Sequence, residues 1–196
     1  MEAVQESLFD IAADRRNLGD GAWVELRTRW LPSAGSVFET LRDEVPWYGE
    51  RRRMYDRIVD TPRLLKFYEA GAALPHPALA AARDRLSRDF WADLHEPLTS
   101  VGLCYYRDGD DSVAWHGDTI GRGATHDTVV AIVSLGATRP FLLRPRGGGA
   151  STRLSVGHGD LLVMGGSCQR TWEHAVPKQP GAGPRISLQF RPRGVR

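Results

Sequence analysis

The pattern of hydrophobic and polar residues along the chain changes near residue 98. Before that point, apolar residues recur at helical spacing in two segments. Ser33, Ser36 and Glu39 form a capping-box pattern, which predicts a helix from there to about residue 45. Pro77 suits a first helical position, and the apolar face that follows it predicts a longer helix over residues 77–94.

After residue 98 the pattern becomes short β-type runs separated by Gly, Pro and Asp. The clearest runs are Val101 to Tyr106, Thr128 to Leu135, Pro140 to Leu143, Asp160 to Met164 and Arg185 to Phe190. Many short strands at close spacing, with no helix between them, indicate an antiparallel sandwich or jelly roll rather than βαβ units. We therefore expect a mainly β protein with flanking α-helices. It would be one domain over residues 1–196, with helices in 1–97 and the β core in 98–194.

Composition limits the class of protein without naming a function. A chain of 196 residues with 41% apolar content fits one domain and can fill its core. Two cysteines, Cys104 and Cys168, give neither a disulfide framework nor a four-thiolate zinc site, so a reducing compartment is expected. No apolar run approaches the roughly 20 residues of a membrane span, and the acidic N-terminus does not resemble a signal peptide. We expect a soluble cytoplasmic monomer with no membrane partner.

The net charge of +2 is unevenly distributed. Residues 139–196 carry 10 Lys/Arg and 2 Asp/Glu, whereas residues 1–138 carry the remaining 16 and 22. Partners that bear phosphate would be drawn to the basic end. The alternative is that these arginines are solvated strand edges that resist edge-to-edge pairing.

Metal-ligand residues are grouped in the second half of the chain, as His116-Gly117-Asp118 and the more distant His174. On an extended strand, positions two apart point to the same side, so His116 and Asp118 can converge on one ion. His174 would complete a metal triad. Two imidazoles and one carboxylate are typical of non-haem iron(II) oxygenases, in which the open positions accept a 2-oxo acid and dioxygen. Zinc on the same residues would do hydrolytic or structural work, and the triad alone leaves both metals open.

A second His-Gly-Asp unit, at residues 158–160, matches the motif as well as the first. It lies between the strand-like runs 153–156 and 161–164, where Gly-Asp most simply makes a turn. Only 16 residues separate His158 from His174, which leaves little room for the intervening strands of a barrel. We therefore expect the first unit to bind the metal. The other candidates considered, His76, His95 and His126, have no partner at a useful spacing.

Arg185 and Arg191 are six residues apart in one strand-like run. An even spacing places both side chains on one face of a regular strand. Two guanidinium groups there would suit a dicarboxylate, because each can form a bidentate pair with a carboxylate. The alternative is a pair of exposed arginines.

Six blocks of sequence together resemble the AlkB family of iron(II)- and 2-oxoglutarate-dependent dioxygenases, and in particular the branch that repairs alkylated DNA and RNA. The blocks are residues 104–107 (CYYR), 111–118 (DSVAWHGD), 134–139 (SLGATR), 159–166 (GDLLVMGG), 172–178 (WEHAVPK) and 185–191 (RISLQFR). They fall in order and at compatible spacing over roughly residues 98–194. Pro46-Trp47 and residues 62–64 match more loosely.

The resemblance implies a double-stranded β-helix in which the metal triad binds Fe(II). Tyr106 and Arg185 would hold the distal carboxylate of 2-oxoglutarate, and Arg191 the carboxylate next to the keto group. In the family's reaction, dioxygen and 2-oxoglutarate give succinate and carbon dioxide. An N-alkyl carbon is hydroxylated, and the alkyl group leaves as an aldehyde. The protein orients the substrate and excludes water while the iron does the oxidation.

Some positions depart from the family's pattern. Cys104 and Ser187 stand where the family usually has asparagines, and losing both amides is expected to weaken the 2-oxoglutarate site without abolishing it. The acidic residues that follow the HxD unit in base-repairing members are here Thr119 and Ile120. A carboxylate can accept a hydrogen bond from a base's exocyclic amine, and Ile120 cannot.

By the same resemblance, residues 1–97 should hold the substrate lid. Candidates to stack on an extruded base are Trp47, Tyr48, Tyr55, Phe67 and Tyr68. Arg51, which begins an Arg-Arg-Arg run, is a candidate phosphate contact. The alternative for most of these aromatic residues is core filling, and we expect only a minority of them to contact substrate.

The segment from Gln5 to Phe9 (QESLF) resembles the short peptides by which bacterial DNA-processing proteins dock on the sliding clamp. Leu8 and Phe9 would be its hydrophobic anchors. The alternative is that this segment packs both side chains onto its own domain.

The sequence thus predicts oxidative removal of alkyl groups from nucleic-acid bases, in DNA rather than RNA by a small margin. Two alternatives stay open. One is a dioxygenase of the same chemistry that acts on a protein or a small molecule, which Ile120 favours. The other is a non-catalytic nucleic-acid-binding module that kept the fold.

Overall fold

A computed structural model describes residues 14–54 and 57–195, with the side chains of 14–49 and 61–195. The predicted clamp-binding segment Gln5 to Phe9 and the candidate Tyr55 lie outside the described residues. Within the described part of the chain, no helix is both long and apolar enough to cross a membrane.

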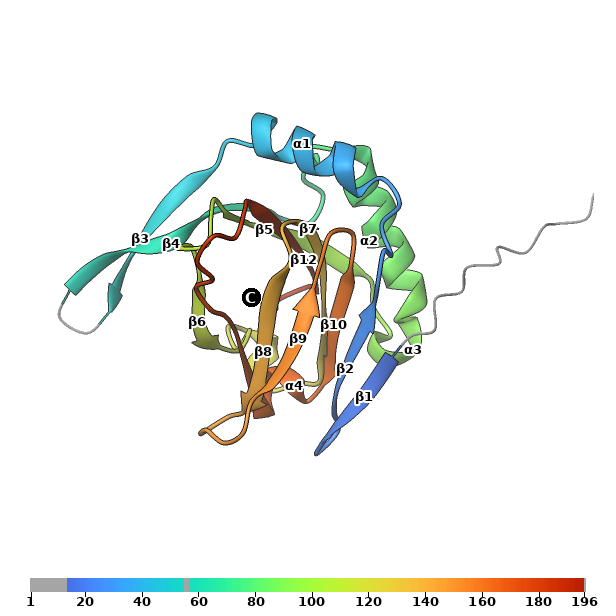
Figure 1. The fold of residues 1–196 in the computed structure, drawn as a ribbon. Helices are drawn as coiled ribbons and strands as arrows, with labels where there is room; N and C mark the ends of the chain where they lie inside the picture. The colour runs from blue at the N-terminus through green and yellow to red at the C-terminus, as the bar shows by residue number, and fades with distance from the viewer. Residues whose placement is uncertain (1–13, 55–56, 196) are drawn as a thin grey trace, which may run out of the picture.

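Two antiparallel sheets face each other and form the body of the molecule (Figure 1). The strands of the larger sheet, in spatial order, are β1 (Asp14–Gly19), β2 (Ala22–Arg27), β10 (Leu161–Gly166), β7 (Thr128–Gly136), β12 (Arg185–Pro192), β5 (Leu98–Tyr106), β4 (Arg57–Tyr68) and β3 (Tyr48–Met54). The smaller sheet has the order β6 (Val113–His116), β11 (Trp172–Val176), β8 (Arg139–Pro145) and β9 (Thr152–Val156). This arrangement confirms the expected jelly roll.

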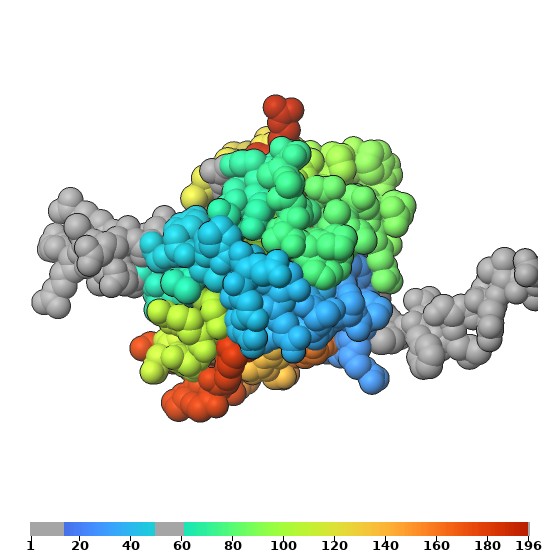
Figure 2. Space-filling model, turned by 90° about the horizontal axis from the view of Figure 1, so that it is seen from above, coloured from blue at the N-terminus to red at the C-terminus, as the bar shows by residue number. Residues whose placement is uncertain are grey.

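The helices lie mainly against the outer face of the larger sheet. They are α1 (Ala34–Glu44), α2 (Pro77–Asp89) and α3 (Trp91–Leu94); a short α4 (Cys168–Thr171) contacts strands of both sheets and the 3-10 turn η1 (Arg122–Ala124). Seen from above, residues of α1 and α2 and the segments beside them form most of the visible surface (Figure 2).

Both predicted helices are present, but their details differ from the sequence-based prediction. Ser33 is the N-cap residue of α1 and makes no side-chain capping bond, so the capping box does not form. α2 begins with Pro77, and the Nδ1 atom of His76 accepts the Ala78 N–H at 3.1 Å. The predicted helix over 77–94 is divided into α2 and α3 at Phe90, whose side chain is fully buried.

The region before residue 98 is not only helical, which corrects the sequence-based description. It contributes four strands, β1 to β4, to the larger sheet. Asp20 and Gly21 join β1 to β2 with φ values of 50° and 78°. An Asp-Gly pair with positive φ at both positions is the two-residue hairpin turn that fits the twist of paired strands. The Asp-Gly signal was therefore present in the sequence.

The core has two apolar layers, one on each side of the larger sheet. On β7, Val129, Ala131 and Val133 pack toward the helices, whereas Val130 and Ile132 pack between the two sheets. This alternation follows from the period of two along a strand. The space between the sheets is filled at one end and open at the other, where the ligand-type residues gather.

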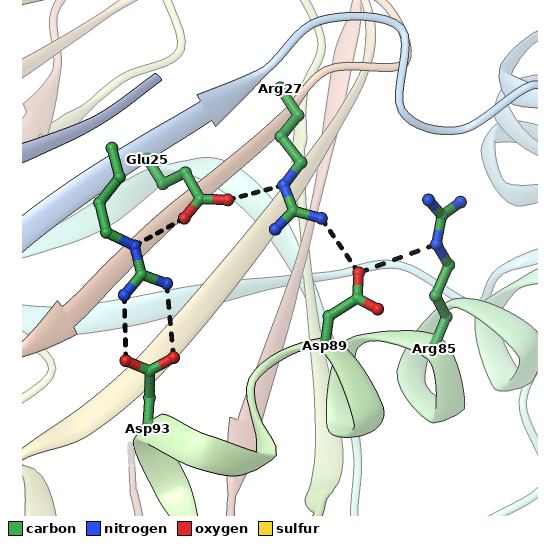
Figure 3. A network of polar contacts seen from close by, with 6 residues as sticks. Glu25, Arg27, Arg85, Asp89 and Asp93 are labelled. Carbon is green, nitrogen blue, oxygen red and sulfur yellow. Dashed lines mark hydrogen bonds and ion pairs between the residues drawn. The ribbon is translucent and has the colours of Figure 1, made fainter. Parts of the chain in front are cut away.

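A network of ion pairs attaches the N-terminal hairpin to α2 and α3 (Figure 3). Glu25 on β2 is buried, and its carboxylate accepts from Arg15 Nε at 2.8 Å and Arg27 Nε at 2.6 Å. Arg15 also forms an ion pair with Asp93 at 3.1 Å, and Arg27 forms one with Asp89 at 3.0 Å. Glu25 is therefore the shared acceptor for two guanidinium groups.

We expect Glu25→Ala to lower the free energy of unfolding by about 1–3 kcal/mol, because it removes the buried carboxylate that both guanidinium groups contact. Asp43→Ala is the matched control, since its pair with Arg42 lies on an exposed surface. That change should cost little stability, because solvent and salt screen an exposed pair. Equal stability of the two variants in urea denaturation would show that the network does not hold the hairpin.

Candidate metal centre

Three potential ligands meet on the smaller sheet. His116 is the last residue of β6 and lies opposite His174 of β11 in the antiparallel pairing, with ring centroids 4.2 Å apart. Asp118 follows two residues after His116. One ligand atom from each of the three residues lies within 4.8 Å of the others, so the structure brings the predicted triad together.

Neighbouring groups fix the orientation of each ligand. His116 Nδ1 lies 2.8 Å from the Ala114 carbonyl oxygen, which leaves Nε2 for a metal. The Asp118 backbone N–H donates to Gln169 Oε1 at 2.8 Å, and Gln169 is buried. Phe141 stacks on the His174 ring at 5.2 Å. Such outer contacts orient metal ligands and are typical of metal sites.

Burial sets the charge state of the triad. Burial and, after it, the charge of the neighbouring His116 lower the pKa of His174 to about 3, so the imidazole is neutral near pH 7. Burial alone would raise the pKa of Asp118, but the Arg191 guanidinium and the two histidines lower it to about 2. Neutral imidazoles with an ionised carboxylate are the forms that bind a metal ion.

Arg191, on β12, contacts the triad directly. Its Nε donates to Asp118 Oδ2 at 2.7 Å, and both side chains are largely buried. Because a carboxylate has two oxygens, this bond leaves Asp118 Oδ1 free for a metal. Arg191 keeps its other N–H groups for a second acceptor.

A cavity of about 550 Å³ adjoins the triad. Its side walls come from β12, β5 and β4 of the larger sheet and from β6 and β11 of the smaller one. The lining includes Arg63, Leu65, Phe67, Cys104, Tyr106, Arg185, Ser187, Gln189, Arg191 and the triad. Arg185 and Arg191 thus line the same cavity, as their even spacing on one strand predicted.

Arg185 is a buried cation at the inner wall, only 2% exposed. Its Nε donates to Ser134 Oγ at 2.9 Å, and its guanidinium carbon lies 5.0 Å from the centre of the Tyr106 ring. Its Nη1 atom is buried and has no hydrogen-bond partner. Burial lowers the pKa of Arg185, and it raises the pKa of Tyr106. A buried guanidinium with an unused donor favours an anionic ligand at this wall.

Cys104 and Ser187, the two departures from the family pattern, lie on facing positions of β5 and β12. Gln189 lies between them in the wall, and its amide donates to the Ser187 hydroxyl. The Cys104 thiol lies 3.7 Å from the Gln189 amide oxygen. The wall therefore contains a side-chain amide, which comes from Gln189 rather than from position 104 or 187.

The candidates for contact with substrate fall into two groups. Tyr48 and Ile120 line the cavity and are 47% and 67% exposed. Trp47 and Tyr68 do not line it: both pack against the core layer under the helices, and Trp47 Nε1 donates to the Leu41 carbonyl. The side chain of Arg51 is outside the described set.

Sequence reasoning missed Arg63, Leu65 and Gln189. Arg63, Leu65 and Phe67 are two apart on β4 and line the cavity, whereas Tyr68 packs against the core layer under the helices. Gln189 could have been found from its even spacing to Arg185 and Arg191. No signal in the sequence identified β4 as a strand facing the site.

The second His-Gly-Asp unit forms a turn. Asp160 accepts the backbone N–H of Gly157 at 2.7 Å and of Arg29 at 2.8 Å, and Gly159 has a φ of 80°. His158 Nδ1 accepts the Gly136 N–H at 2.9 Å. His158 does not line the cavity.

We expect His158→Ala to leave iron-dependent turnover close to that of the wild type, because this residue only caps a backbone N–H. The loss of that bond should cost about 0.5–1.5 kcal/mol of stability. Steady-state turnover and urea denaturation of the same preparation check both parts. A folded His158→Ala protein without activity would reverse the choice between the two units.

The donor set therefore fits a divalent metal with a dianionic ligand beside it. Two neutral imidazoles and one ionised carboxylate offer a facial triad, and the unused Arg185 donor lies in the same cavity.

Comparisons with known proteins agree with this geometry. The model of the 2OG-Fe(II) oxygenase superfamily matches residues 32–191. The chain is 32% identical over 197 residues to alpha-ketoglutarate-dependent dioxygenase alkB homolog 3 of Bos taurus, covering 84% of this chain and 65% of that protein. It is 31% identical over 217 residues to DNA oxidative demethylase ALKBH2 of Arabidopsis thaliana, covering 89% and 68%.

Two solved structures share the fold. One is described as the structure of OsALKBH1, with a TM-score of 0.61 and 16% identity over 90% of this chain and 100% of that one. The other is a prolyl-4-hydroxylase of Pseudomonas putida, with a TM-score of 0.60 and 17% identity over 87% and 92%.

Proposed function

Because this chain belongs to the AlkB family of the 2OG-Fe(II) oxygenase superfamily, we propose that it removes alkyl groups oxidatively from nucleic-acid bases. The family uses Fe(II), 2-oxoglutarate and dioxygen, and the chain is a 2-oxoglutarate-dependent dioxygenase. Three of its relatives carry the name DNA oxidative demethylase. The base substrate and the roles of individual residues are our proposals.

We assign the metal to His116, Asp118 and His174. When bound there, iron(II) supplies the oxidation of the substrate by dioxygen, coupled to decarboxylation of 2-oxoglutarate. His116 and His174 would bind as neutral imidazoles and Asp118 through the oxygen that Arg191 does not use. Arg191 holds the carboxylate in place and so orients the third ligand.

We assign 2-oxoglutarate to the wall of the larger sheet. Arg185, with Tyr106 beside it, would hold the distal carboxylate, since Arg185 has an unused donor in a buried position. Arg191 would bind the carboxylate next to the keto group with the N–H groups that do not contact Asp118. Cys104 and Ser187 would border the chain of the co-substrate, with Gln189 between them.

The residues at the mouth of the cavity support a nucleic-acid base as the substrate. Tyr48 and Ile120 are two of the three exposed large hydrophobic residues among the described part of the chain, and both line the cavity that ends at the triad. Together with Phe67, they offer a flat apolar entrance suited to a stacked aromatic base. An alkylated base extruded from its strand could reach the metal there. Residues 1–97 would act as the substrate lid through Tyr48 and β4, within one domain over 1–196.

The test is turnover with matched oligonucleotides. The full chain loaded with iron(II) should form succinate from 2-oxoglutarate faster with an N-methylated oligonucleotide than with the same sequence unmethylated. Stimulation that disappears when iron is chelated supports the proposal. Equal succinate formation with both oligonucleotides would remove nucleic-acid bases as the substrate.

Ile120 favours a second candidate, a dioxygenase of the same chemistry that hydroxylates a protein or a small molecule. Neither Thr119 nor Ile120 offers a carboxylate for an exocyclic amine. Succinate formation without stimulation by any methylated oligonucleotide would favour this candidate. Absence of both iron binding and turnover would instead favour a non-catalytic nucleic-acid-binding module.

A further inference from the structure

We propose that Gln189 is a positioning residue for the co-substrate. It holds the Ser187 hydroxyl in the orientation that donates a hydrogen bond to the distal carboxylate of 2-oxoglutarate. The inference rests on the proposed co-substrate site and adds to it a role for the Gln189 amide. It comes from the contacts among three polar side chains of the cavity wall, those of Cys104, Ser187 and Gln189.

The contacts of the Gln189 amide define which way it points. Its Nε2 atom lies 3.1 Å from the backbone carbonyl oxygen of Ser187, which can only accept a hydrogen bond. The nitrogen of the amide, and not its oxygen, therefore faces Ser187. The Oε1 atom lies 3.7 Å from the Cys104 thiol, which can donate. Both contacts give the same orientation of the amide.

This orientation determines where the Ser187 proton goes. The Gln189 Nε2 atom also donates to the Ser187 hydroxyl oxygen. A hydroxyl that accepts from an amide keeps its own proton for another acceptor. In the part of the chain that the structure describes, Ser187 Oγ makes no other hydrogen bond, although the residue is buried and lines the cavity. Its proton is therefore available to a ligand in the cavity.

The position of Ser187 on β12 indicates which group of the ligand it meets. Arg185, Ser187, Gln189 and Arg191 occupy every second position of the strand, and all four line the cavity. Ser187 is the neighbour of Arg185 in this row, and the buried Nη1 atom of Arg185 has no partner. A carboxylate has two oxygens and can accept from both donors. We therefore assign the two donors to one carboxylate.

Gly102 of β5 makes room for the amide. It lies directly opposite Gln189 in the pairing of β5 with β12. A Cβ atom at this position would lie 3.0 Å from Gln189 Oε1 and 2.8 Å from Arg191 Nη1. Any larger residue would thus displace the amide, the guanidinium or both. The glycine lets both side chains keep their places in the wall.

Gln189→Met removes the amide and keeps a side chain of similar length. We expect it to weaken 2-oxoglutarate binding by about tenfold, the usual effect of losing one hydrogen bond to a charged group. The measurement is an anaerobic titration of the iron(II)-loaded full chain with 2-oxoglutarate, which requires neither turnover nor nucleic acid. Ser100→Ala is the matched control, because Ser100 is a buried serine of β5 that does not line the cavity. It should bind 2-oxoglutarate as the wild type does.

A double variant tests whether Gln189 acts through Ser187. Ser187→Ala alone should weaken binding by about tenfold. Ser187→Ala combined with Gln189→Met should also weaken it by about tenfold, because both changes remove the same donated proton and their effects do not add. A loss of about 100-fold in the double variant, the product of two independent effects, would contradict the inference.

Gln189→Glu is a second variant that preserves the size of the side chain. Its carboxylate would accept the Ser187 proton and repel the co-substrate anion, so binding should be at least as weak as in Gln189→Met. Thermal unfolding without co-substrate shows which variants are folded. Wild-type affinity for 2-oxoglutarate in either folded variant would overturn the inference and leave the proposed function standing. Failure of the iron-loaded wild type to bind 2-oxoglutarate would overturn both.

Discussion

Asp118→Ala is expected to lower iron-dependent turnover by more than about 100-fold, which exceeds the usual effect of removing a group that only supports a ligand. The change removes one of three ligands from a site whose ligand atoms lie within 4.8 Å of one another. It also leaves Arg191 without the carboxylate that it contacts at 2.7 Å. The variant should therefore lose both metal affinity and the position of a co-substrate arginine.

Iron binding should be measured directly, by titration of the protein with Fe(II) under anaerobic conditions, beside turnover. Asp118→Asn is the informative partner, because it keeps an oxygen and the shape of the side chain but removes the charge. We expect weaker iron binding in Asp118→Asn and none measurable in Asp118→Ala. Wild-type iron affinity in Asp118→Ala would exclude this carboxylate as a ligand.

Arg185→Met is expected to raise the KM for 2-oxoglutarate by about 100-fold or more, since a buried charge pair typically loses a few kcal/mol when one partner is removed. Without co-substrate, however, the variant should be at least as stable as the wild type. Arg185 is 2% exposed and has an unpartnered Nη1, and its burial lowers the pKa of its guanidinium. Replacing such a cation with an apolar side chain of similar length removes a cost of desolvation.

Arg139→Met is the matched control for this prediction. Arg139 is also buried, but its guanidinium donates to the carbonyl oxygens of Asp108, Asp111 and Pro177, and it does not line the cavity. Its loss should lower stability by leaving these carbonyls unpaired, with little effect on the KM for 2-oxoglutarate. Thermal unfolding with and without 2-oxoglutarate separates the two roles. Undiminished stabilisation of Arg185→Met by 2-oxoglutarate would remove Arg185 from the site.

The β core and the ligand triad were predictable because both depend on side chains that alternate every two residues along a strand. Strands such as β7 and β12 alternate every two residues, and the same rule placed Arg185 and Arg191 on one face. The choice between the two His-Gly-Asp units followed from local turn chemistry, and the hydrogen bonds of Asp160 agree with it.

The N-terminal half was harder to predict, because its strands carry charged residues on a half-buried face. β1 and β2 contain Arg15, Glu25 and Arg27, whose charges hide the alternation but are paired with one another and with the helices. Whether Phe67 or Tyr68 lines the cavity depended on which face of β4 each one occupies. That face is set by pairing with β5, a contact distant in sequence.

The most direct test of the central claim is the stoichiometry of one reaction mixture, in which succinate and the demethylated base are both quantified after incubation with an N-methylated oligonucleotide. We predict that one base is demethylated for each succinate molecule formed in excess of the amount formed without oligonucleotide. Asp118→Ala should form neither product. Succinate formed with no change in the methylated base would contradict the claim that a nucleic-acid base is the substrate.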